Sequence, residues 1–156
     1  MKHLRLYTQT SLLTGLLLAP LWLLAQSVDK EPVAVIEIGG AASRSLTNGE
    51  SNFGASFAVE ATAIENWLEL EAGITPLFQH HSTEWTIDFL FKKPWTISSK
   101  AEFMLGSGPE WIHTNARGVK TNSVAVEVAP DFMFWRSAKH RFGWYLEPSY
   151  EVRPSA

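Results

Sequence analysis

The chain contains no cysteine, and this absence excludes two features common in exported proteins. It can form no disulfide framework, and it cannot carry a lipid anchor attached to a cysteine. Charged residues are also scarce, at 19% against about 25% in typical soluble domains. Beyond the N-terminus no apolar run reaches about 20 residues, so a helical membrane span is excluded for the body of the chain.

The first residues are typical of a secretory signal peptide. Lys2, His3 and Arg5 give a basic start, and the apolar segment from Leu12 to Ala25 follows, interrupted by Pro20. This segment is short for a hydrocarbon core of ~30 Å, which favours cleavage after Ala25 over an uncleaved anchor. We therefore expect residues 1–25 to be a signal peptide and residues 26–156 to be a single mature domain.

Loss of the signal leaves an acidic mature chain. With Lys2 and Arg5 removed, 11 basic residues face 16 acidic ones, a formal charge of −5. Binding to phosphates requires a basic surface, so we expect no nucleic-acid partner.

Apolar and polar residues alternate through the rest of the chain, most clearly from Thr83 to Leu105. One face of this stretch carries Trp85, Ile87, Phe89 and Phe91, and after Lys92-Lys93-Pro94 the same face continues with Trp95, Ile97, Ala101, Phe103 and Leu105. A period of two indicates β-strands, because successive side chains point to opposite faces of a sheet. The stretch predicts an antiparallel hairpin with its turn at 92–94.

The same reading predicts seven strands and no helix in the mature chain. The expected connections are 44–51, 64–66, 79–82, 92–94, 114–121 and 137–141. The second, fourth and sixth are short, and the two long polar ones are the first and the fifth. Bacterial transmembrane barrels alternate short periplasmic turns with longer external loops, so this arrangement favours a membrane barrel.

The two faces of the strands differ in a way that also favours a membrane barrel. Bulky aromatic residues lie on one face, many near strand ends, as in the aromatic girdles of such barrels. The other face carries small residues with sparse charges, which suit a narrow interior where acids pair with bases: Glu37, Glu60, Glu69, Glu71, Asp88, Lys92, Lys100, Glu102, Glu127, Asp131, Glu147 and Glu151. We expect an all-β, antiparallel, up-and-down transmembrane β-barrel. A soluble, lipocalin-like calyx that binds an apolar ligand in the periplasm is the alternative fold.

Residues 32–152 resemble the OmpA-type family of small eight-stranded outer-membrane barrels. The resemblance rests on the strand pattern and on Gly106-Ser107-Gly108-Pro109-Glu110 and Gly143-Trp144-Tyr145-Leu146-Glu147-Pro148. It implies an outer-membrane location, contact with outer-membrane lipid and assembly by the barrel insertion machinery. The family's last strand ends in an aromatic residue, whereas this chain ends at Arg153-Pro154-Ser155-Ala156 with seven predicted strands, so we expect the barrel domain to lack its eighth strand at the C-terminus.

One group of residues has the composition of a catalytic site. His80, Ser82 and Glu84 share one face of a strand near a turn. Some outer-membrane lipid A deacylases use serine, histidine and glutamate on the outer face of a barrel, so a lipid-modifying hydrolase is an alternative function. His80, His81 and Glu84 are a poor metal site, because adjacent histidines on a strand point to opposite faces. A further set could be interpreted as catalytic carboxylates with two lysines, but we expect its members to form ion pairs in the interior of the barrel: Glu110, Glu127, Asp131, Glu147, Lys92 and Lys100.

The expected function is that of a small, non-enzymatic outer-membrane protein that is structural or presents loops to an unidentified partner. No cofactor or metal is expected. The architecture is porin-like, but side chains fill the interior of an eight-stranded barrel, so no wide channel is expected.

Overall fold

A computed structural model of the chain describes residues 5–10, 34–45 and 49–153, and for residues 5–10 only the backbone. Within these ranges the chain forms strands and no helix: β1 (Arg5–Thr10), β2 (Ala34–Ser45), β3 (Ser51–Ile64), β4 (Leu68–Gln79), β5 (Ser82–Ser98), β6 (Ala101–Ala116), β7 (Val119–Trp135), β8 (Gly143–Leu146) and β9 (Pro148–Arg153). This part of the chain therefore holds no helix able to cross a membrane.

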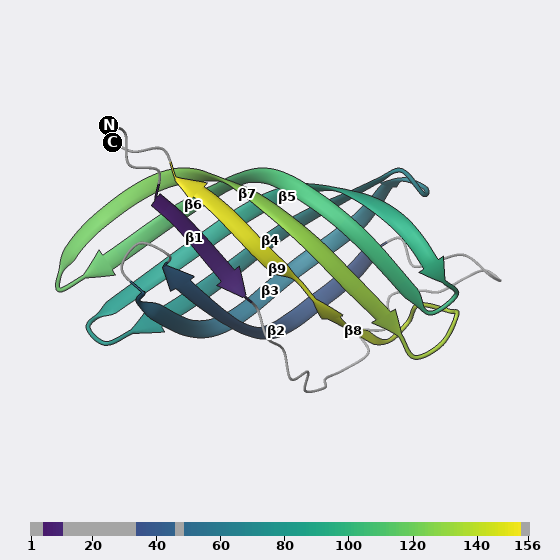
Figure 1. Cartoon of the computed structure of the whole chain (residues 1–156), viewed down its shortest axis with the longest axis horizontal. Coiled ribbons are helices and arrows are strands. Elements are labelled where there is room, and N and C mark those ends of the chain that lie inside the picture. The colour runs from purple at the N-terminus through teal and green to yellow at the C-terminus, as the bar shows by residue number, and fades with distance from the viewer. Residues whose placement is uncertain (1–4, 11–33, 46–48, 154–156) are drawn as a thin grey trace.

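All the strand pairings are antiparallel, and β2 to β7 each pair with the next strand in sequence. β8 and β9 both pair with β7, so they act as one strand interrupted at Glu147. β1 lies beside β9 (Figure 1) and pairs with both β9 and β2. The expected all-β, up-and-down fold is confirmed, and the seven expected strands correspond to β2–β7 and the β8–β9 pair.

β1 falls within residues 1–25, the expected signal peptide. The apolar segment of that signal, Leu12 to Ala25, lies outside the described residues. Cleavage after Ala25 therefore stays a prediction.

The prediction of a turn at residues 92–94 was wrong. β5 continues through Lys92 and Pro94 to Ser98, and the chain reverses at Ser99-Lys100. The reason is visible in the sequence, since Phe91 and Trp95 are an even number of residues apart and the alternation passes through 92–94 without a change of phase. Lys100 was expected in the interior, but its place in the turn leaves it exposed.

The prediction of a long loop at residues 114–121 was wrong as well. The pairing of β6 with β7 extends as far as Ala116 and Val119, which flank a two-residue turn of Arg117 and Gly118. Both turn residues have positive φ, 51° and 83°, as the twist of a tight hairpin requires. Residues 136–142, at the other end of the strands, form a longer connection than this turn. The expected alternation of long and short loops is therefore absent.

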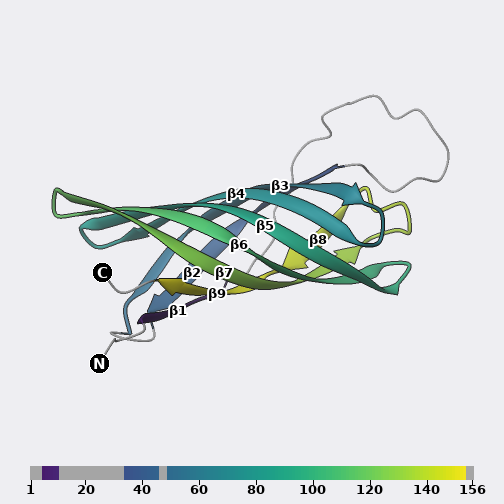
Figure 2. The same cartoon turned by 90° about the horizontal axis from the view of Figure 1, so that it is seen from above.

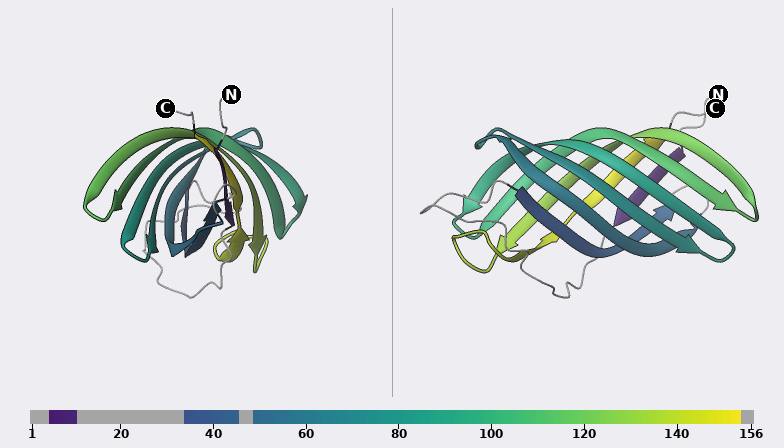
Figure 3. Two further views of the ribbon diagram at one scale, coloured as in Figure 1. Left: turned by 60° about the vertical axis from the view of Figure 1, so that its left-hand side comes forward. Right: turned by 180° about the vertical axis from the view of Figure 1, so that it is seen from behind.

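The strands tilt together (Figure 2) and curve around a common interior (Figure 3). Side-chain burial is the reverse of that in a soluble domain. Large apolar side chains point outward and are exposed, with Ile36 at 62%, Phe53 at 65% and Phe89 at 40%. Lys92 and Asp131 point inward and are fully buried. The expected outward face of Trp85, Ile87, Phe89 and Phe91 and the expected inward acids are thus confirmed.

Candidate functional site

The most highly charged part of the interior surrounds the side chain of Lys92. Lys92 follows Asp88 and Leu90 on the inward face of β5, and none of its surface is exposed. Its ammonium nitrogen lies 3.0 Å from Asp131 Oδ2, 2.5 Å from Glu147 Oε2 and 3.5 Å from Glu60 Oε2, and it also pairs with Glu71. One cation is therefore shared by four carboxylates.

The sheet register explains why the acids converge on this point. Glu60 on β3 and Glu71 on β4 are directly opposite each other, so their side chains leave the sheet at the same height. Asp131 comes from β7, and Glu147 from the break between β8 and β9. Lys92 thus connects strands that are not neighbours in the sheet, across the interior.

Glu37 on β2 completes the acidic cluster. Its carboxylate, together with those of Glu60, Glu71 and Asp131, offers oxygens that all lie within 4.8 Å of one another. Such a set has the donor atoms that a hard metal ion prefers. The ammonium of Lys92 already pairs with three of the four, so the cluster is best described as a carboxylate cage around a lysine.

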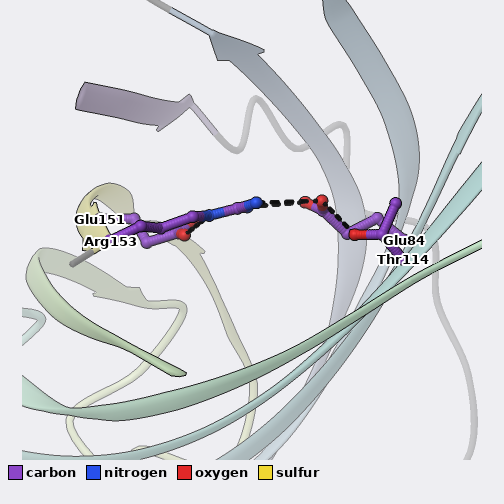
Figure 4. Close-up of polar contacts among 4 residues, drawn as sticks. All are labelled: Glu84, Thr114, Glu151 and Arg153. Carbon is purple, nitrogen blue, oxygen red and sulfur yellow. Dashed lines mark hydrogen bonds and ion pairs between the residues drawn. The ribbon is translucent and has the colours of Figure 1, made fainter. Parts of the chain in front are cut away.

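A second ion pair crosses the interior between β9 and β5. Arg153 on β9 reaches Glu84 on β5, with Arg153 Nη2 3.0 Å from Glu84 Oε1, and it also binds Glu151 on its own strand. Thr114 on β6 donates a hydrogen bond to Glu84 Oε2 over 3.1 Å. In Figure 4 the Arg153 and Glu84 side chains point toward each other from opposite sides. Glu84 is therefore held in the interior by two other strands.

An apolar cluster fills the interior near the end where residues 136–142 connect β7 to β8. Met104, Met133, Trp135 and Tyr145 pack together there, with Val35 against them. Leu77 and Ile112, which are also buried, lie on the far side of the charged region along their strands. The interior is thus packed with side chains at several levels.

The three candidate catalytic residues do not form a hydrogen-bonded set. Glu84 binds Arg153 and Thr114, while His80 and His81 form the two-residue turn between β4 and β5, with His81 at a φ of 64°. Ser82 lines a shallow surface hollow of about 510 Å³ with His81 and Arg117. Within the described residues, no hydrogen bond joins His80, Ser82 and Glu84 to one another.

The pattern of the sequence predicted the inward acids, but it left the position of Lys92 divided between two assignments and did not place Arg153 in the interior. Lys92 was assigned to a turn as well as to the inward face, and the unbroken alternation around it was the signal that decides between the two. Arg153 was treated as part of the terminal tail. Its position two residues after Glu151 placed it on the inward face, and that signal was available.

Comparison of the chain with protein-family models, with curated proteins and with solved structures finds no match.

Proposed function

We propose that the chain is a small outer-membrane β-barrel protein with a structural or surface-interaction role and no catalytic activity. Its partners are outer-membrane lipid around the barrel and the insertion machinery during assembly. A signal peptide at residues 1–25 directs its export.

The reversal of side-chain burial carries this proposal. An outward surface of exposed Ile, Val, Phe and Trp is unfavourable in water, since exposed apolar area costs about 25 cal/mol per Å². The same surface is favourable against acyl chains, and antiparallel strands in a barrel satisfy their backbone groups there. Outward aromatic stacks add to this surface, with Trp95 against Phe103 and Phe134 against Trp144.

The interior argues against the alternative of a soluble calyx. A binder of apolar ligands needs an apolar pocket with few polar groups. Here the middle of the interior holds Lys92 among carboxylates, and Met104, Met133, Trp135 and Tyr145 fill one end. These groups neutralise or pack against one another, which supports a structural role.

The hydrolase alternative requires the histidine to act as the base next to the serine and a carboxylate to orient that histidine. Glu84 instead makes its hydrogen bonds to Arg153 and Thr114. The positions of His80 and Ser82 therefore support a polar turn and not a catalytic triad.

Cell fractionation tests the location. We expect the protein in the outer-membrane fraction, extractable only with detergent, and migrating differently on gels with and without boiling. Release by osmotic shock as a soluble protein, with migration independent of heating, would contradict the proposal.

A further inference from the structure

One end of the barrel is more basic than the other. Because successive strands run in opposite directions, the β3–β4, β5–β6 and β7–β8 connections all lie at this end. They carry one acidic residue, Glu65, and four exposed basic residues, which define the basic end: Lys100, Arg136, Lys139 and Arg141. At the opposite end, the described parts of the β2–β3, β4–β5 and β6–β7 connections carry one glutamate and one arginine, Glu50 and Arg117.

The β7–β8 connection, residues 136–142, is folded against the β5–β6 turn. The backbone N–H of Trp135 donates a hydrogen bond to the carbonyl oxygen of Lys100 over 2.8 Å. His140 stacks on the ring of Trp135, with 4.9 Å between the ring centroids, and its Nε2 lies 3.2 Å from the carbonyl oxygen of Ser99. These contacts between two connections gather the basic residues on one surface.

Aromatic side chains lie beside the basic end, on the outward faces of the strands that it joins. Trp95 stacks on Phe103, and Phe134 stacks on Trp144, which is 63% exposed. The ammonium of Lys93 lies 5.9 Å from the centre of the Trp95 ring. Aromatic residues of this kind lie at the level of the lipid headgroups in a membrane barrel. In a membrane, the basic end would therefore lie at the level of the lipid phosphates.

The side chains of the basic end have the chemistry that binds phosphate. A guanidinium group binds phosphate oxygens through two parallel hydrogen bonds, and an ammonium group binds them as a point charge. Four basic residues against one acidic residue leave these connections with a formal charge of +3. Clusters of lysine and arginine beside a membrane-spanning segment attract anionic lipid headgroups.

We propose that the basic end binds the phosphate groups of anionic phospholipids, whose acyl chains then lie along the outward faces of β5–β8. This inference rests on the proposed function, since it requires the barrel to lie in a membrane. A lipid fits better than a soluble polyanion, because the basic residues adjoin the exposed rings of Trp95 and Trp144. A lipid offers an apolar chain to these rings as well as a phosphate to the cations.

A comparison of two brominated lipids tests the proposal. The full chain carries a bimane fluorophore at Leu105→Cys, an exposed outward position on β6, the strand that begins next to Lys100, and is inserted into phosphatidylcholine vesicles. Brominated acyl chains are supplied on either phosphatidylglycerol or phosphatidylcholine. We expect phosphatidylglycerol to quench at a mole fraction about fivefold lower, the factor by which a single basic residue favours an anionic lipid surface. Arg136→Gln combined with Arg141→Gln is expected to lose most of this preference.

Arg117→Gln combined with Lys120→Gln is the matched control, because it removes the same number of positive charges at the opposite end. We expect this control to keep the preference for phosphatidylglycerol at Leu105. If the first pair of substitutions prevents folding, Lys100→Gln combined with Lys139→Gln is expected to show the same loss. Equal quenching by the two lipids in the parent protein, or an equal loss of preference in the control, would overturn the proposal and leave the barrel in the membrane. Quenching by neither lipid would contradict the proposed function, and this inference with it.

Discussion

The ammonium of Lys92 lies 3.0 Å from the carboxylate of Asp131, although 39 residues separate the two in sequence. β5 and β7 are not paired with each other, so this contact crosses the interior. Through Glu60 the same ammonium also reaches β3, which is likewise not paired with β5, and through Glu71 it reaches the neighbouring strand β4. Lys92 therefore links β5 to β3 and β7, with which β5 shares no backbone hydrogen bonds.

Replacement of Lys92 tests this role. Lys92→Met keeps much of the side-chain volume but leaves several buried carboxylates without their cation, and we expect it to destabilise the fold by about 3–5 kcal/mol. Urea unfolding of the protein in lipid vesicles measures this change. Lys120→Met, at an exposed position, is the control and is expected to stay within about 0.5 kcal/mol of the parent. Equal stability of the two variants would show that the cage is not needed.

The Arg153–Glu84 ion pair is expected to link β9 to β5 energetically. In a double-mutant cycle with Arg153→Met and Glu84→Gln, we expect a coupling energy of about 1–3 kcal/mol, because charged hydrogen bonds in partly buried positions are of that order. Arg153→Met is expected to cost more than Glu84→Gln, since it also leaves Glu151 unpaired. Additive effects of the two substitutions would contradict a direct interaction.

Gly108 on β6 is required by the close approach of β5. A Cβ atom at this position would overlap the backbone oxygen of Phe89, which cannot move without shifting its strand. We expect Gly108→Ala to destabilise by about 1–3 kcal/mol, as overpacking does in other proteins. Gly118→Asn is the comparison, because that turn position has open space and a φ of 83° that asparagine tolerates. A larger loss in Gly118→Asn than in Gly108→Ala would be inconsistent with this packing.

Ser82→Ala separates the structural proposal from the hydrolase alternative. We expect the variant to fold. We also expect the purified parent and Ser82→Ala proteins to show the same background level of lipid-esterase activity, because Glu84 is bound to Arg153 and Thr114. Deacylation of lipid by the parent protein that disappears in Ser82→Ala would instead establish a catalytic serine.

The two faces of the strands were predictable because they follow from a local rule. Ile87 and Asp88 are adjacent, and period-two geometry alone sends one outward and the other inward. The turns were harder, because Pro94 and the polar run around Arg117 resemble turn signals, while the actual reversals depend on how long two strands continue to pair. Pro94 is paired with Met104 inside the strand, against its own preference for turns but in agreement with the unbroken alternation from Phe91 to Trp95.

The ion pairs across the interior could not be derived from spacing. Arg153 and Glu84 are 69 residues apart and meet because β9 and β5 curve around the same interior. The opposition of Asp88 and Glu110 likewise depends on the register of β5 and β6. The sequence could supply the set of inward charges, and only the register could decide which of them face each other.

The lack of cysteine allows the central claim to be tested directly, because a single introduced cysteine can be labelled without interference. We place a bimane fluorophore at Phe89→Cys, in the middle of the outward face of β5, or at Lys120→Cys near the Arg117–Gly118 turn, and insert each protein into vesicles. The account predicts strong quenching by brominated acyl chains at position 89 and weak quenching at position 120. Quenching of position 89 by aqueous iodide as efficient as that of position 120, with no effect of brominated lipid, would contradict it.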